Sequence, residues 1–315
     1  MDTHPKAAPA GGISRAAGRL ISRKHTEWLY GYLFTAPLVL GVLVFFILPI
    51  LFTFYMSMTD WTGLTPGKWI GLDNFTAMFS DMRVGREVIN TAVYALGTVP
   101  VGMALSVLAA NALNRKRRGA AVYTTLYFLP NVTMPAAVAL VWAWMFNSKY
   151  GIINAFLGTI GLPQPMWMGD ASFILAAIMI VSVWMGLGYN IIMLLAGLKN
   201  IPDTLYEAAD IDGATERTKF FRLTLPLLSP YIFFLLVMSV MGAFKAFDLI
   251  YMFNASQTYG EIIDASRTMV YGIYEKGFSL YKMGFASAEA VLLFALIGAM
   301  TALQFWAQKK WVFYE

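Results

Sequence analysis

Residues 207–226 read EAADIDGATERTKFFRLTLP, and they separate two apolar segments at about 172–197 and 229–250. Each apolar segment is long enough to cross a membrane as a helix, which takes about 20 residues. A connection between two neighbouring helices needs only a few residues, but the polar segment here, 199–228, is far longer than that. The extra length indicates a structure of its own outside the membrane.

The local signals in this loop predict two helical pieces. Pro202 followed by Asp203 is typical of a helix start, and Gly213 is typical of a helix end. A second helical piece over 215–223 is expected to stop before Pro226, because a proline disfavours helical geometry in the residue before it. Small alanines beside acidic residues make the first piece a narrow protrusion. Such a protrusion suits a groove on another protein.

Outside this loop, the composition is that of a membrane protein. The 315 residues are 58% hydrophobic and 13% charged, with a mean hydropathy of +0.61, which is beyond the averages of soluble domains. Six apolar segments reach membrane-spanning length. They lie at about 29–51, 88–110, 121–146, 172–197, 229–250 and 286–307. We therefore expect an all-α polytopic protein with six transmembrane helices in the lipid bilayer.

The same composition argues against a catalytic chain. There are 0 Cys and only 2 His, His4 and His25, both in the polar N-terminal tail. A zinc site, a thiol nucleophile and a Ser-His-Asp triad therefore lack the residues they need, and we predict no catalytic residue and no metal site. The net charge of +5 does not indicate nucleic-acid binding, because the basic residues lie between apolar segments.

The basic residues instead predict the orientation of the chain. Most of the 23 Lys and Arg residues lie in alternate polar segments, namely the tail, 115–118, 199–222 and 309–310. The positive-inside rule places these segments, and both termini, on the cytoplasmic side. The predicted organisation is a cytoplasmic tail at 1–28, a first transmembrane helix and outer loop at 29–86, a five-helix core at 87–310 that contains the loop 199–228, and a cytoplasmic end at 311–315.

The long loop resembles the EAA loop of ABC importer permeases. That pattern is Glu-Ala-Ala, three residues, Gly, nine residues, an aliphatic residue, any residue and Leu-Pro. The chain keeps this spacing with Glu207, Ala208, Ala209, Gly213, Leu223, Leu225 and Pro226, where Leu223 replaces the usual Ile. Asp212 and Phe220 further resemble the carbohydrate-uptake branch. Weaker similarities at 71–75, 128–130 and 142–154 extend the resemblance over most of the chain.

The resemblance implies a type I ABC importer permease fold and a set of partners. In that family the loop forms a coupling helix that sits in a cleft of the ATPase subunit, which implies this role for Glu207, Ala208, Ala209, Asp212, Gly213 and Pro226. ATP and Mg would then bind to a separate pair of ATPase subunits, and no cofactor would bind to this chain. The other implied partners are an extracytoplasmic solute-binding protein and a second, related permease subunit in a heterodimer, although homodimers also occur in the family. The implied location is a bacterial plasma (inner) membrane.

Candidate residues for a solute pathway lie on the fourth and fifth apolar segments. Side chains at i, i+4 and i+7 stack on one side of a helix. The candidates are Ser182, Gly186, Tyr189, Asn190, Ser239, Ala243, Lys245 and Ala246. Hydroxyl, amide and aromatic groups beside small residues can form a cavity that binds sugars, and the resemblance places the family's substrate contacts here too. The alternative is a packed seam between membrane helices, where small residues also occur at this spacing.

Three charged residues fall within or near the apolar segments. Lys245 and Asp248 are three apart, and we expect them to pair with each other, although contact with solute is the other possibility. Glu289 is expected at the interface with water near the start of the sixth segment. An ion-coupled secondary transporter needs more ionisable groups within the membrane than these. An ion-coupled transporter is therefore the alternative function, and it would work by a different mechanism.

The sequence thus predicts a permease subunit of an ATP-driven, binding-protein-dependent importer for a sugar, oligosaccharide or related polyol, working by alternating access. An importer of the same type for a non-sugar solute such as glycerol phosphate is the alternative, because its permease would have the same sequence features. The chain itself is not expected to be an enzyme, because ATP hydrolysis would take place on the ATPase subunit.

Overall fold

The protein is represented by a computed structural model that describes residues 28–64, 67–114 and 119–313. The predicted tail 1–28 therefore lies almost wholly outside the described residues, as do the basic cluster 115–118 and the last two residues. Where described, the chain consists of helices and their connections, with one isolated β-bridge between Thr59 and Trp69. The all-α prediction is confirmed. The described residues divide into two units, with the boundary between Tyr55 and Met56.

The first unit carries an apolar helix that starts at Trp28, and the helical run Trp28–Met56 is long enough to cross a membrane. It includes a π-helical turn, η1 (Leu43–Ile47), directly before α2 (Leu48–Met56). Pro49 follows this turn, and a proline has no backbone N–H to donate to the helical ladder. The departure from α geometry thus lies where the proline disturbs the hydrogen bonding.

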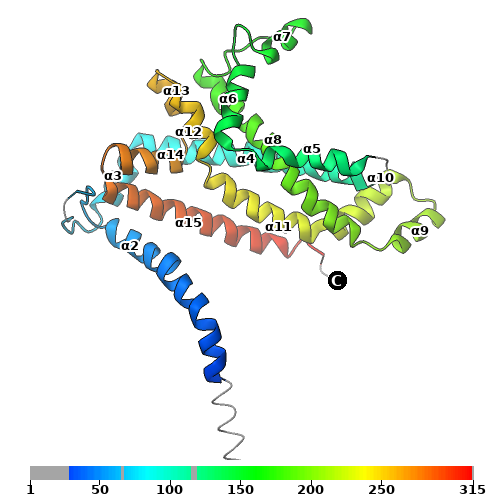
Figure 1. Ribbon diagram of the computed structural model, residues 1–315, viewed down its shortest axis with the longest axis horizontal. Coiled ribbons are helices and arrows are strands. Elements are labelled where there is room, and N and C mark those ends of the chain that lie inside the picture. Colours follow the sequence, from blue (N-terminus) through cyan, green and yellow to red (C-terminus); the bar gives the residue numbers. More distant parts are fainter. Residues whose placement is uncertain (1–27, 65–66, 115–118, 314–315) are drawn as a thin grey trace, which may run out of the picture. The chain divides into compact units, whose positions relative to one another are not determined.

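Five of the longer helices form the body of the second unit. They are α4 (Met82–Asn114), α5 (Ala120–Val132), α8 (Ala171–Lys199), α11 (Leu225–Phe244) and α15 (Met283–Gln308). Helix α4 packs against α8 and α11, α5 packs along α8, and α11 also contacts α15 (Figure 1). These contacts bring three of the predicted spans, α4, α8 and α11, side by side.

Short helices lie at the ends of these long ones. They are α3 (Asp73–Ser80), α6 (Pro135–Met145), α7 (Ile152–Thr159), α9 (Asp203–Ile211), α10 (Glu216–Lys219), η2 (Phe220–Thr224), α12 (Asp248–Ala255), α13 (Gly260–Ser266), α14 (Met269–Tyr274) and η3 (Glu275–Ser279). Within the second unit, α9 lies at one end and α3 and α14 lie at the opposite end (Figure 1). The protein therefore has two structurally different ends.

The predicted third span is broken. Helices α5 and α6 together are apolar enough to cross a membrane, but they are bent by 101° at their junction. The break follows from Pro135, because Met134 before it has an extended ψ of 128° instead of a helical one. Five helical runs of the described chain are long and apolar enough to span, and the bent pair brings the number to six.

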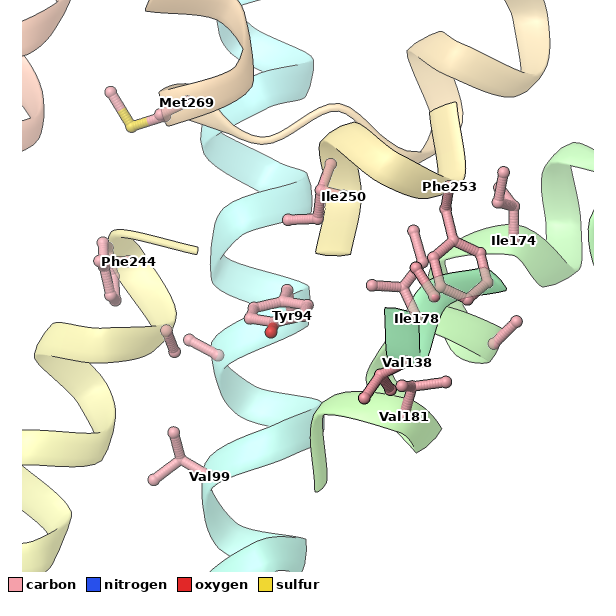
Figure 2. Close-up of a cluster of buried hydrophobic side chains, with 14 of the residues drawn as sticks. Tyr94, Val99, Val138, Ile174, Ile178, Val181, Phe244, Ile250, Phe253 and Met269 are labelled. Carbon is pink, nitrogen blue, oxygen red and sulfur yellow. The ribbon is translucent and has the colours of Figure 1, made fainter. Parts of the chain in front are cut away.

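A buried hydrophobic cluster joins α4, α6, α8 and α12. Figure 2 shows Tyr94 of α4, Val138 of α6, Ile178 of α8 and Ile250 of α12 among its members. Ile178 and Ile250 are fully buried. Burying one such side chain contributes about 1.5 to 3 kcal/mol relative to its exposure. The cluster therefore fixes the short helix α12 against the long helices.

Candidate functional site

The loop between α8 and α11 forms the short helix α9 that the sequence predicts. The helix runs from Asp203, directly after Pro202, to Ile211, and it is terminated by a turn at Gly213, which has a φ of +75°. The Gly213 N–H donates to the Asp210 carbonyl (3.0 Å), and the Ala214 N–H donates to the Ala209 carbonyl (2.9 Å). These two bonds are those of a Schellman motif, which needs a left-handed residue and thus favours glycine. Both predicted ends of the helix are confirmed.

Helix α9 presents its side chains to the outside. None of its residues is buried, and Glu207 and Ala208 are exposed. Ile211 is 87% exposed at the tip of the helix. Helix α9 is therefore exposed along most of its length.

The prediction that the second helical piece ends before Pro226 is wrong. Helix α10 continues through η2 into α11 without interruption. In η2 the Leu225 N–H donates to the Phe220 carbonyl, five residues back, so the turn is wider than an α turn. This wider turn comes just before Pro226, which has no N–H to donate, and the helix continues through the proline. The loop is therefore joined directly to the α11 span.

Side-chain contacts hold α9 against this helix. The Tyr206 hydroxyl lies 3.0 Å from Thr224 Oγ1, and Lys219 Nζ lies 2.8 Å from Asp210 Oδ1. The hydrogen bond to Asp210, followed by that to Glu216, raises the pKa of Lys219 above its ordinary value, so Lys219 is an ammonium at neutral pH. Tyr206 also packs against the buried cluster between α4, α8 and α11. A displacement of α9 would thus be passed on to the spans.

A cavity of about 340 Å³, lined by apolar groups with several hydroxyl and amide side chains among them, lies between α4, α5, α8 and α11. Six of the eight predicted pathway residues line it. They are Ser182, Gly186, Tyr189, Asn190, Ser239 and Ala243. The rest of the lining includes Tyr94, Thr98, Gly102, Asn131, Met238 and Gly242. Residues from four separate helices are therefore brought to one space.

A second cavity of about 280 Å³ shares Tyr94, Asn131, Ser182 and Gly186 with the first. Its own wall is the segment 246–250, which comprises the connection after α11 and the start of α12. Ala246 is the seventh of the predicted pathway residues to line a cavity, and Asp248 lines the same one. The two cavities therefore adjoin each other beside α8.

Lys245 departs from the prediction in two respects. It is exposed at the end of α11 and is absent from the described residues that line the two cavities. The expected ion pair with Asp248 is also absent from the ion pairs of the described chain. The reason is that α11 ends at Phe244 and α12 begins at Asp248, so the i, i+3 spacing of a continuous helix does not apply.

The glycines of α8 show which small residues line a cavity and which allow close packing of helices. A Cβ added to Gly186 of α8 or to Gly242 of α11 would meet nothing within 4 Å. A Cβ on Gly188 would come within 2.2 Å of the Tyr127 carbonyl oxygen, and one on Gly197 would come within 2.7 Å of the Tyr231 ring. Gly188 and Gly197 therefore allow close helix packing, whereas Gly186 faces open space.

The sequence reasoning missed the contribution of α4. The Tyr94 hydroxyl donates to Ser182 Oγ (2.8 Å), and Ser182 in turn donates to the Ile178 carbonyl (2.8 Å). Tyr94 and Thr98 belong to a polar stripe on an otherwise apolar helix. The stripe consists of Glu87, Asn90, Thr91, Tyr94, Thr98, Gly102 and Ser106. Spacings of three and four residues place these side chains on one face, so the signal was present in the sequence.

A buried ion network occupies the start of this stripe. Lys276 Nζ lies 2.8 Å from Glu87 Oε2 and also bonds Glu289. Arg267 Nη2 lies 2.5 Å from Glu275 Oε2, and Arg267 Nη1 lies 3.7 Å from Glu87 Oε1. The expectation that Glu289 meets water is wrong, because its residue is only 1% exposed. Contacts of α15 with α3, α14 and η3 cover this part of the helix.

Residues 102–312 match the family of binding-protein-dependent transport system inner membrane components. The chain belongs to this family. The matched range includes the EAA loop, both helices attached to it and most of the first cavity. The resemblance seen in the sequence is thus confirmed, and the permease is a membrane-embedded transport subunit in a family of permeases and not of enzymes.

Two relatives are similar over almost their whole length. The permease is 36% identical to the probable ABC transporter permease protein YesP of Bacillus subtilis, over 91% of this chain and 93% of that one. It is 34% identical to the sn-glycerol-3-phosphate transport system permease protein UgpA of Yersinia enterocolitica, over 92% and 97%. A chain in the crystal structure of a bacterial alginate ABC transporter, with an alginate-bound periplasmic protein, matches the permease with a TM-score of 0.80 at 21% identity. The match covers 93% of this chain and 98% of that chain. The fold is therefore that of an ABC importer permease.

Proposed function

We propose that this permease forms one half of the solute pathway of a bacterial importer for a sugar, an oligosaccharide or a related polyol. The observation that carries the proposal is the cavity between α4, α5, α8 and α11 with its hydroxyl and amide side chains, combined with the exposed helix α9 on the loop that leads into α11. The relatives support the class of transporter, since they are ABC transporter permeases, and UgpA is named for a phosphorylated polyol.

The chemistry of the cavities supports a hydroxyl-rich solute. Tyr94, Ser182, Asn190 and Ser239 offer hydroxyl and amide groups, and Tyr189 offers a half-exposed ring. Sugar hydroxyls can exchange hydrogen bonds with such groups, and the CH face of a sugar can pack on an aromatic ring.

The second candidate solute is a phosphate ester such as glycerol phosphate, and the charges of the cavity lining indicate how well it would bind. Among the described residues that line the two cavities none is Lys or Arg, and Asp248 is the charged one. Anionic phosphate groups are bound by cations and backbone N–H groups. The half of the pathway that this chain provides is therefore better suited to an uncharged polyol.

Coupling to ATP is assigned to α9. In this proposal Glu207, Ala208, Ala209, Asp212 and Gly213 dock in a cleft of an ATPase subunit, where ATP and Mg bind. Closure of the ATPase pair moves α9, and the contacts of Tyr206 and Lys219 transmit the movement to α11. The uninterrupted helix through Pro226 acts as a rigid lever between the ATPase and the cavity.

The proposed complex has further subunits. A second, related permease supplies the other half of the pathway, and an extracytoplasmic binding protein delivers the solute. Support for the latter comes from the alginate transporter, whose structure includes a periplasmic protein. In this arrangement α9 and both termini lie in the cytoplasm, and α12 to α14 lie toward the outside of the inner membrane. Alternating access then exposes the cavity to each side in turn.

The test is sugar uptake by proteoliposomes that contain the permease with its partner permease, ATPase and binding protein. Glu207→Lys and Gly213→Pro should abolish uptake and the stimulation of ATP hydrolysis by the loaded binding protein, while the complex still assembles. Glu261→Lys makes the same charge change at an exposed position outside the loop and should leave both activities unchanged. Full uptake by the two loop variants would overturn the coupling role of α9.

A further inference from the structure

The buried ion network joins elements that are far apart in the sequence. Glu87 on α4, Lys276 on η3 and Glu289 on α15 form a contiguous group, and Arg267 before α14 adjoins it. The exposed fractions of Glu87, Arg267, Lys276 and Glu289 are 0%, 3%, 5% and 1%. Buried ion pairs are often no more stabilising than apolar side chains of the same volume, because desolvation offsets the attraction. What they do fix is the relative position of the charged groups.

The first connection from this network to the cavities runs along α4. Asn90 Nδ2, one turn after Glu87, donates to the carbonyls of Asp264 (3.0 Å) and Arg267 (2.9 Å). The hydroxyl of Thr91 accepts the Met269 N–H (3.0 Å). Tyr94 is on the same face, two turns from Glu87, and lines both cavities. The network and these bonds therefore set the rotation and depth of α4 where it contributes Tyr94.

The second connection runs to α12. Thr268, which follows Arg267 directly, donates from Oγ1 to the Ala246 carbonyl (3.2 Å). Ala246 lies at the break between α11 and α12 and starts the wall of the second cavity. This hydrogen bond thus connects the residue next to Arg267 to the start of this wall.

The Glu87 carboxylate packs directly against the backbone of α14. A Cβ added to Gly272 of α14 would come within 2.3 Å of the Glu87 carboxyl carbon. Contacts this close are not observed for real side chains, so an alanine at this position would displace the carboxylate or the helix. Gly272 therefore offers a way to disturb the network without removing a charge.

We propose that Glu87, Arg267, Lys276 and Glu289 are positioning residues for the solute pathway. They contact no part of either cavity themselves. They act through Tyr94 and through the Thr268–Ala246 hydrogen bond, and they hold the α12 wall and α4 in one fixed relation. This role rests on the proposed function of the cavity as a pathway.

The first test measures the position of the α12 wall without transport. The chain has 0 Cys, so a Leu249→Cys substitution at the second cavity gives this chain a single thiol for a water-soluble maleimide, and the label is measured on the separated permease subunit. In the assembled complex, Glu87→Gln, Lys276→Met and Gly272→Ala should each change the labelling rate by roughly threefold or more, as expected for coupled positions. Lys282→Met, which removes an exposed charge nearby, should not.

The second test uses uptake of the sugar identified by the proteoliposome assay. The same three variants should raise the apparent KM or lower the maximal rate by about tenfold, and Lys276→Arg should retain most of the activity because it keeps a cation between the two carboxylates. A role in packing alone predicts the reverse order, with methionine tolerated and arginine not, because methionine matches lysine in volume.

The outcomes of the two tests are distinguishable. Labelling and uptake equal to the native chain in all three variants, or a Lys276→Met variant better than Lys276→Arg, would overturn the positioning role. A complex that takes up no sugar in its native form would instead contradict the proposed function. The labelling result would then still decide whether the network positions α12.

Discussion

The hydroxyl of Tyr94 donates a 2.8 Å hydrogen bond to Ser182 Oγ, and both residues line both cavities. The bond joins α4 to α8 across 88 positions of sequence. It orients the tyrosine ring and leaves the hydroxyl beside the space assigned to the solute. The polar groups of the pathway are therefore held by one another as well as by the helices that carry them.

Removal of this hydroxyl should weaken transport without unfolding the protein. Tyr94→Phe keeps the ring, and Ser182 keeps its bond to the Ile178 carbonyl. The loss of one hydrogen bond corresponds to about 0.5 to 1.5 kcal/mol, so the apparent KM for uptake should rise a few-fold. Tyr150→Phe, at a tyrosine that is 70% exposed, provides the matched control. Equal KM values for the two variants would show that the Tyr94 hydroxyl does not contact solute.

Two glycines of α8 should give opposite results when they are enlarged. Gly186→Leu projects into the cavity, where a Cβ meets nothing within 4 Å, so the complex should assemble normally but lose most uptake. Gly188→Ala collides with the backbone of α5 and should reduce the yield of folded protein. Gel filtration and uptake rates measured in parallel separate the effects. Unimpaired uptake by Gly186→Leu would place the pathway elsewhere.

The Schellman end of α9 predicts a ranking at Gly213. Its φ is +75° and no atom lies within 4 Å of an added Cβ, so the cost of a side chain is backbone strain alone. Gly213→Ala should therefore cost about 1 kcal/mol of α9 stability, whereas Gly213→Asn should cost less, because asparagine tolerates the left-handed region. The stimulation of ATPase activity by the loaded binding protein should fall in the order Gly, Asn, Ala. An alanine variant as active as the native chain would contradict this.

The ion pairs of Lys219 predict a flat pH response of the coupling loop. The pKa of Lys219 is raised by its hydrogen bond to Asp210, so its contribution is complete below the ordinary pKa of lysine and is lost only as the pH rises through the raised value. ATPase stimulation should not depend on Lys219 titration between about pH 6 and 9. Lys219→Met should lower stimulation to the same extent throughout that range. A loss confined to the upper part of it would mean that the lysine titrates there.

The parts of the structure that follow from local sequence could be predicted. The start of α9 at Asp203 and its end at Gly213 depend on residues within one short segment, and the cavity lining of α8 follows from helical spacing of Ser182, Gly186 and Tyr189. The predicted helix end before Pro226 is wrong because the effect of proline on the preceding residue holds for α geometry, whereas η2 is a wider turn. The Glu87–Lys276 pair could not be predicted, because its members lie 189 residues apart and only the folded chain brings them together.

The polar stripe of α4 is an intermediate case. Glu87, Thr91, Tyr94 and Thr98 recur at helical spacing in an apolar helix, and that pattern alone indicates a face turned away from lipid. The sequence could thus show that α4 has a polar face. It could not show that one part of the face meets a cavity and the other meets Arg267 and Lys276.

The proposal that this permease belongs to an ATP-driven importer is tested most directly by measuring which energy source drives uptake. Proteoliposomes with the complete complex are given labelled sugar and binding protein, with internal ATP, with a non-hydrolysable analogue, or with an imposed proton or sodium gradient. We expect uptake only with hydrolysable ATP and binding protein, and no response to either gradient. Uptake that follows an ion gradient in the absence of ATP would contradict it and would favour an ion-coupled transporter.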